Sequence, residues 1–257
     1  MQSKTTKVGE LNIHYYSGGQ GRPLIVVHGG GIGAKSWIEP VRELLKHYRV
    51  YVPDLPGFGK SQSLKEEFHI TEVAAFINNF ADSLGINNFD IVGHSIGGGI
   101  ALNYAFKFPE RVRKLVLVSS FCLGNEVALW IRLATLQIFT PLAKFVHSAF
   151  KAIGWVIRSL RIPFEFNNPL PRVKLEIGRR LTTLKGQNGV LFDRLAELTM
   201  PTLLVWGSKD GIVPVSQAYA AAKVIPDCYI HVCEGVGHGL YRHENSEFSQ
   251  LLMGFLK

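Results

Sequence analysis

The chain has 257 residues, of which 47% are hydrophobic, and a formal net charge of +8 at pH 7. This length and apolar content suffice for one sizeable core, with room for an inserted subdomain. No apolar run is long enough to predict a transmembrane helix, and the polar first residues lack the apolar stretch of a signal peptide. Three cysteines suit a reducing compartment, so we expect a cytoplasmic protein.

The first half of the chain predicts short strands that alternate with helices. Residues 4–9 and 11–16 predict a hairpin or two edge strands. Leu24–Val27 is too apolar to alternate, which is typical of a strand buried in a parallel sheet. The other elements expected here are a helix at 37–47, a strand at 49–52, a helix at 71–84 that ends at Gly85, a strand at 89–92, a helix at 100–108 and a strand at 113–118.

The same alternation returns near the carboxyl end. We expect a strand at 202–206, a helix at 215–224, a strand at 228–233 and a closing helix with one apolar face at 248–255. Strands that alternate with helices imply an α/β fold, with a mostly parallel central sheet and helices on both faces.

One turn between a predicted strand and a predicted helix carries a chemical motif. Residues 93–97 read Gly-His-Ser-Ile-Gly, and G-x-S-x-G between a strand and a helix is the signature of a nucleophile elbow. Glycines on both sides let strand and helix approach each other closely around a strained serine backbone. Ser95 is therefore the candidate nucleophile.

Two later loops supply the groups that such a serine needs. Asp210 comes shortly after the strand that ends at Trp206, and His238 comes shortly after the strand that ends at Cys233. Ligands of parallel sheets bind beyond the carboxyl ends of the strands, where these loops would meet. A serine hydroxyl needs a base, and the base needs a partner that fixes its tautomer. We expect His238 to be the base and Asp210 to orient it.

These motifs resemble those of α/β-hydrolase-fold proteins with a serine nucleophile, a superfamily that includes esterases, lipases and meta-cleavage-product hydrolases. The matching segments are HGGG at 28–31, DLPGFGKS at 54–61, GHSIGG at 93–98, WGSKDGIVP at 206–214 and GVGHGL at 235–240. The resemblance implies an acyl-enzyme mechanism, with the backbone N–H groups of Gly30 and Ile96 as the oxyanion hole. Haloalkane dehalogenases and epoxide hydrolases of this fold carry Asp as the nucleophile, and Ser95 argues against both.

The resemblance also implies a helical cap inserted after the strand that follows the nucleophile helix. We therefore expect a core at 1–120, a cap at 121–195 and the rest of the core at 196–257. Residues 121–200 carry eleven Lys and Arg residues against five acidic ones, so the basic excess lies mostly in this region.

Residues 127–162 are unusually apolar, so the cap is expected to give the active site a hydrophobic pocket. The expected substrate contacts are His94, Trp130 and Phe139, although a structural role in its loop is also open for His94. A lid that touches an anionic membrane or lipid surface is a second interpretation of the same apolar and basic stretch. No recognised motif for nucleic-acid binding accompanies the basic charge.

The predicted activity is hydrolysis of a small ester with a hydrophobic acyl or aromatic group, without metal or cofactor. Hydrolysis of a carbon–carbon bond is the alternative, because residues 29–34 resemble the HGxGxGA-like loop of meta-cleavage-product hydrolases. Those enzymes usually have Asn where this chain has His94, and tend to have Trp where it has Gly239. A ligand-binding or receptor member with little turnover is the third possibility. Oligomeric state is not predicted.

Three local patterns compete with this interpretation. Glu126 is an alternative acid, because some relatives carry the acid after the earlier strand. Residues 54–61 end like a phosphate-binding loop, but Asp54 replaces the first glycine of that motif, and we expect it to be structural. Gly29, Gly31 and Ala34 match a dinucleotide fingerprint, with Asp54 at the spacing of a ribose-binding acid. That function would make the elbow and both partner loops coincidental.

Overall fold

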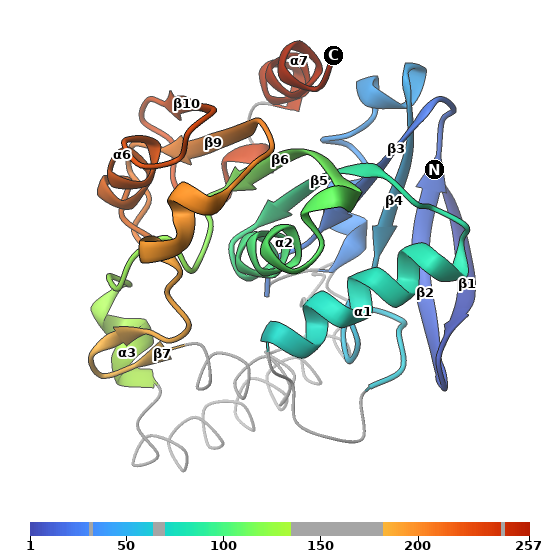
Figure 1. The fold of residues 1–257 in the computed structure, drawn as a ribbon, viewed down its shortest axis with the longest axis horizontal. Helices are drawn as coiled ribbons and strands as arrows, with labels where there is room; N and C mark the ends of the chain where they lie inside the picture. Colours follow the sequence, from blue (N-terminus) through green and yellow to red (C-terminus); the bar gives the residue numbers. More distant parts are fainter. Residues whose placement is uncertain (31–32, 64–69, 135–181, 243–244) are drawn as a thin grey trace, which may run out of the picture.

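The computed structural model describes residues 1–30, 33–63, 70–134, 182–242 and 245–257. Its centre is an eight-stranded sheet with the order β1-β2-β4-β3-β5-β6-β9-β10 (Figure 1). The strands are β1 (Gln2–Val8), β2 (Leu11–Gly18), β3 (Arg22–Val27), β4 (Tyr48–Pro53), β5 (Phe89–His94), β6 (Val112–Val118), β9 (Thr202–Gly207) and β10 (Cys228–Cys233).

Six of these strands run parallel, as the alternating pattern predicts. Strand β1 pairs antiparallel with β2, and β2 pairs antiparallel with β4. The pairs β4–β3, β3–β5, β5–β6, β6–β9 and β9–β10 are all parallel. The carboxyl ends of β5, β9 and β10 therefore lie at one edge of the sheet, where the predicted reactive loops begin.

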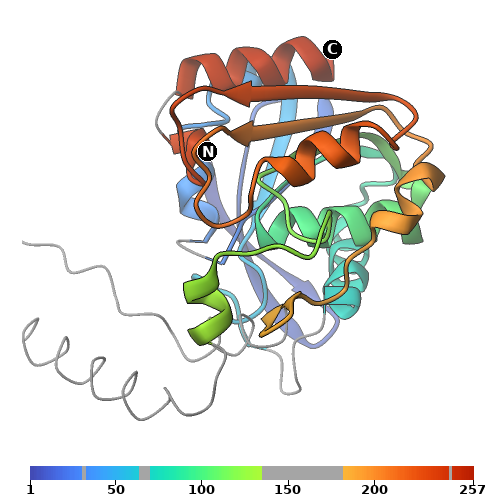
Figure 2. The same ribbon diagram turned by 90° about the vertical axis from the view of Figure 1, so that its left-hand side faces the viewer.

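Helices cover both faces of the sheet. The helices α1 (Ile70–Ser83), α2 (Ile96–Lys107) and α6 (Ser216–Ala222) lie on one side, and α7 (Asn245–Leu256) lies on the other (Figure 2). The expected α/β-hydrolase architecture is confirmed for the core. The elbow helix begins at Ile96, which is earlier than the apolar run from residue 100 predicts.

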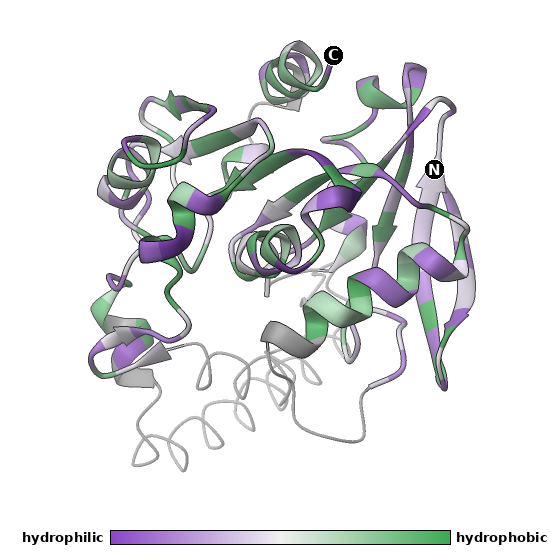
Figure 3. Cartoon of the chain, in the orientation of Figure 1, coloured by the Kyte–Doolittle hydropathy of each residue, from purple (hydrophilic) through white to green (hydrophobic). Residues whose placement is uncertain are grey.

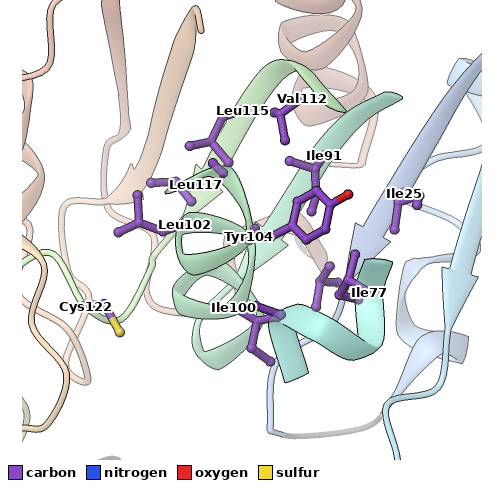
Figure 4. Close-up of a cluster of buried hydrophobic side chains, with 14 of the residues drawn as sticks. Ile25, Ile77, Ile91, Ile100, Leu102, Tyr104, Val112, Leu115, Leu117 and Cys122 are labelled. Atoms are coloured by element: carbon purple, nitrogen blue, oxygen red, sulfur yellow. The ribbon is translucent and has the colours of Figure 1, made fainter. Parts of the chain in front are cut away.

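The core forms two layers because successive side chains of each buried strand point to opposite faces. Ile91, Leu115 and Leu117 contact the layer that contains Tyr104 of α2 (Figure 4). Their neighbours in the chain, such as Val92 and Val116, join the layer under α7. Both faces are buried, which explains why the central strands are mostly apolar (Figure 3).

The predicted helix at 37–47 is wrong. The structure has two short 3-10 helices instead, η1 (Ala34–Trp37) and η2 (Glu43–Lys46). Pro40 has no N–H to donate, and its carbonyl accepts a hydrogen bond from the Ser249 hydroxyl at 2.6 Å. The N–H of Leu44 bonds to Val41 instead, which is the tighter spacing of a 3-10 helix.

Most of the expected cap lies outside the described residues, Phe139 included. The part before the gap contains α3 (Leu129–Ala134), to which Trp130 belongs. The part after the gap contains the short pair β7 (Thr182–Thr183) and β8 (Gly186–Gln187). The buried Gln187 side chain accepts from the Cys122 N–H and donates to the Glu126 carbonyl, both at 2.8 Å. These bonds attach the far end of the insertion to the loop after β6.

In the part of the chain that the structure describes, no helix has the length and apolar content to span a membrane.

Candidate active site

The elbow holds Ser95 in a conformation that few residues adopt. Ser95 has φ 56° and ψ −120°, between the last residue of β5 and the first of α2. A Cβ atom at Gly93 would lie 2.3 Å from the Gly97 carbonyl oxygen, and one at Gly97 would lie 2.2 Å from the Val27 carbonyl oxygen. Both distances are shorter than atoms tolerate, so the motif needs glycine at these two positions.

The structure brings the three predicted reactive side chains into one line. Ser95 Oγ lies 2.9 Å from Nε2 of His238. On the other side of the ring, Nδ1 of His238 lies 2.9 Å from Oδ2 and 3.1 Å from Oδ1 of Asp210. A histidine whose Nδ1–H donates to a carboxylate has its Nε2 lone pair free to accept from a hydroxyl. The arrangement can therefore take a proton from Ser95.

Asp210 is held as a carboxylate. Its side chain is fully buried, and burial alone raises the pKa of a carboxyl group. The hydrogen bond from His238, its charge, and the N–H groups of Val213 and Ile212 outweigh burial, so the pKa of Asp210 is lowered. The two backbone N–H groups donate to Oδ1 at 3.0 and 2.9 Å. Asp210 thus remains negatively charged beside the histidine at neutral pH.

The loop after β3 lies against the elbow. A Cβ atom at Gly29 would lie 3.1 Å from Ser95 Cβ, and one at Gly30 would lie 2.9 Å from Cδ1 of Ile96. Ile96 is the first residue of α2, where backbone N–H groups have no partner within the helix and the dipole favours negative charge. The two residues expected to form an oxyanion hole are therefore neighbours beside the serine.

The alternative acid, Glu126, lies elsewhere. Its side-chain Oε2 is 3.5 Å from the Ser216 hydroxyl, on the exposed surface. His238 pairs with Asp210 instead.

Asp54 has a structural set of contacts. Its carboxylate accepts from Nδ1 of His14 at 2.8 Å, from the N–H of Ala34 at 2.8 Å and from the N–H of Lys60 at 3.1 Å. His28 also has a structural contact, because its Nε2 accepts a hydrogen bond from the Leu55 N–H at 3.0 Å and so connects the loop after β3 to the loop after β4. The Asp54 oxygens are occupied by the protein's own donors, which leaves little for a ribose to bind.

His94 points away from the side of the sheet that carries α2. It is buried with Trp37 and Tyr241, and its Nε2 donates to the backbone carbonyl of His238 at 2.9 Å. These contacts favour the structural role expected for His94, and none of them supports its expected contact with substrate. Trp37 and Tyr241 were not among the predicted site residues, since nothing in their spacing marks them. Across the described residues, no three His, Cys, Asp or Glu side chains gather as a metal site would need.

Comparison with known proteins supports the α/β-hydrolase fold. A sequence model of the alpha/beta hydrolase fold matches residues 22–143. A 2-hydroxy-6-oxo-6-phenylhexa-2,4-dienoate hydrolase from Burkholderia cepacia is 28% identical, over 97% of this chain and 92% of its own length.

Two solved structures extend the comparison. A membrane phospholipase A, described as a bacterial virulence factor, is 25% identical with a TM-score of 0.75, covering 99% of this chain and 85% of its own. A thermophilic esterase from Thermogutta terrifontis is 23% identical with a TM-score of 0.76, covering 100% and 98%, and shows the shared fold. Sheet order, elbow and these similarities together define a hydrolase of the α/β type. The chain has the fold of the α/β-hydrolase superfamily.

Proposed function

We propose that the protein hydrolyses carboxylic esters with hydrophobic acyl or aromatic groups, and that Ser95 forms the acyl-enzyme. The main support is the unbroken line of hydrogen bonds from Ser95 through His238 to the buried Asp210. Such a line activates a hydroxyl that is otherwise a poor nucleophile at neutral pH.

The reaction proceeds in two halves. His238 takes the proton of Ser95 as Oγ attacks the ester carbonyl, and the carbonyl oxygen becomes negative next to the N–H groups of Gly30 and Ile96. The tetrahedral intermediate then collapses, and His238 gives its proton to the departing alcohol. Water enters, loses a proton to His238 and attacks the acyl carbon. The acid leaves and Ser95 regains its proton, so no proton is gained or lost by the enzyme.

Asp210 stabilises His238 while the ring carries that proton. A negative charge beside Nδ1 favours the imidazolium and keeps the Nε2 lone pair directed at Ser95. The lowered pKa of Asp210 means that it stays ionised throughout the cycle.

Cleavage of a carbon–carbon bond is the second candidate. Its support is the 28% identity, over nearly the whole chain, to a hydrolase named for 2-hydroxy-6-oxo-6-phenylhexa-2,4-dienoate. His94 and Gly239 stand where such enzymes usually have Asn and Trp, and this difference favours the ester.

Hydrolysis of p-nitrophenyl esters from acetate to laurate tests the proposal, with Ser95→Ala beside the wild type. We expect turnover by the wild type and loss of at least about 10⁴-fold in kcat in the variant. The acyl chain length that is hydrolysed fastest would indicate how long an acyl group the pocket accepts. Absence of ester turnover, together with cleavage of a 2-hydroxy-6-oxo-dienoate, would replace this proposal by the second candidate.

A further inference from the structure

We propose that His94 is a positioning residue, which holds the backbone of His238 so that the His238 ring stays within hydrogen-bonding distance of Ser95. The inference rests on the proposed function, because that function makes His238 the base. It assigns His94 a task other than contact with substrate.

Two adjacent residues of the elbow hold His238 at two points. The Ser95 hydroxyl lies 2.9 Å from Nε2 of the His238 ring, and Nε2 of His94 lies 2.9 Å from the His238 backbone oxygen. One contact fixes the ring and the other fixes the backbone that carries it. The loop after β10 is thereby tied directly to the turn that holds the nucleophile.

The contact also fixes the proton on the His94 ring. A carbonyl oxygen can only accept, so Nε2 of His94 carries the hydrogen. Nδ1 of His94 is buried and has no hydrogen-bond partner among the described residues, as expected for a nitrogen without a proton. Burial, and then the charge of nearby His238, lower the pKa of His94 to about 3. The hydrogen bond to the His238 carbonyl and the charge of Asp210 act in the opposite direction but are outweighed, and Arg242 lowers the pKa further.

Neutrality of His94 matters for the chemistry of its neighbour. The ring centroids of His94 and His238 are 4.9 Å apart. A second positive charge at that distance would oppose formation of the His238 imidazolium. His94 therefore supplies a hydrogen bond to His238 without adding a competing charge.

The surroundings keep the His94 ring in place. Tyr241 meets it edge-on with ring centroids 4.7 Å apart, and Trp37 stacks on Tyr241 at 4.4 Å with nearly parallel planes. On the opposite loop, a Cβ atom at Gly29 would lie 2.7 Å from Nδ1 of His94. A ring packed this closely has no room to swing away from the His238 carbonyl.

Two substitutions separate the hydrogen bond from the volume of the side chain. His94→Gln keeps an N–H donor at about the position of Nε2, whereas His94→Leu fills similar space without a donor. We expect His94→Leu to lower kcat about 10²-fold, the cost of a small misplacement of a catalytic group, with KM within about twofold. His94→Gln should recover most of this loss. His231→Leu, an equivalent change on the exposed face of β10, should leave both constants unchanged.

Equal kcat in His94→Leu and wild type would overturn the inference, and so would an equal loss in the Leu and Gln variants when both remain folded by circular dichroism. A second measurement does not depend on turnover. In ¹⁵N NMR spectra of the wild type, His94 should stay neutral, with a slowly exchanging Nε2–H, from pH 5 to 8. Protonation in that range, or a proton on Nδ1, would overturn the inference even if the enzyme cleaved no ester.

Discussion

Ser95 Oγ and His238 Nε2 lie 2.9 Å apart although 143 residues separate them in the chain. Their strands, β5 and β10, are not neighbours, since β6 and β9 lie between them. The loop after β10 reaches the elbow by crossing the end of β9 at Gly207, where a Cβ atom would lie 2.3 Å from the Val236 carbonyl oxygen. The absence of a side chain at Gly207 therefore leaves room for the loop after β10, which carries His238.

Asp210→Asn should lower kcat by about 10⁴-fold, the effect seen when an orienting acid of this kind is neutralised. The amide can present its N–H₂ group to Nδ1 of His238, which favours the wrong tautomer. Steady-state kinetics on the best ester of the panel would measure the loss.

Glu126→Gln is the matched control, because Glu126 is the competing acid and lies at an exposed position. It should leave kcat and KM within about twofold of the wild type, as expected for a surface change away from the site. A large loss in Glu126→Gln with little effect in Asp210→Asn would reverse the assignment of the acid.

Gly30→Val tests the loop beside the elbow. The first added carbon would lie 2.9 Å from Cδ1 of Ile96, so the loop or the Ile96 side chain must move. If Gly30 supplies an oxyanion donor, its displacement should cost about 10²–10³-fold in kcat. Gly254→Ala adds a methyl group to α7, where a Cβ atom would have no neighbour within 4 Å among the described residues, and should keep full activity. Full activity in Gly30→Val would exclude Gly30 from the oxyanion hole.

Strands and loop positions could be predicted from the sequence because each depends on local pattern. Wholly apolar runs such as Leu24–Val27 predict buried strands, and those strands are found. The order Ser95, Asp210, His238 predicts which loops meet, because parallel strands end at one edge. The geometry agrees with that prediction, while the chemical roles of the three residues await the experiments above.

The contacts that local pattern missed all depend on distant parts of the chain. The helix expected at 37–47 is broken near Pro40, whose carbonyl accepts a hydrogen bond from the hydroxyl of Ser249 in α7, 209 residues further along the chain. The bond from His94 to His238 spans 144 residues and leaves no mark in spacing or composition. Such contacts arise when two layers pack together, which a single sequence does not encode in any short window.

Asp54→Ala should destabilise the protein. The change would leave three donors near the core without a partner: Nδ1 of His14 and the N–H groups of Ala34 and Lys60. Each buried unsatisfied donor costs about 1–3 kcal/mol, so the free energy of unfolding should fall by at least about 2 kcal/mol. Urea denaturation would measure it. Glu39→Ala, in an exposed pair with Arg42, should give no measurable change. Equal stability in Asp54→Ala would refute the structural role.

Acid should remove a part of the stability that Asp210 provides. Its pKa in the folded protein lies below its value in the unfolded chain, which is about 3.9. Above that value Asp210 is ionised in both states, and its bonds to His238 and to the backbone contribute fully. As pH falls toward the folded pKa, the unfolded chain takes up a proton first, so the contribution declines. The difference in unfolding free energy between wild type and Asp210→Asn should therefore shrink as the pH falls from 5 to 3. Denaturation curves at pH 5, 4 and 3 would measure it, and a difference that stays constant or grows over this range would contradict the lowered pKa.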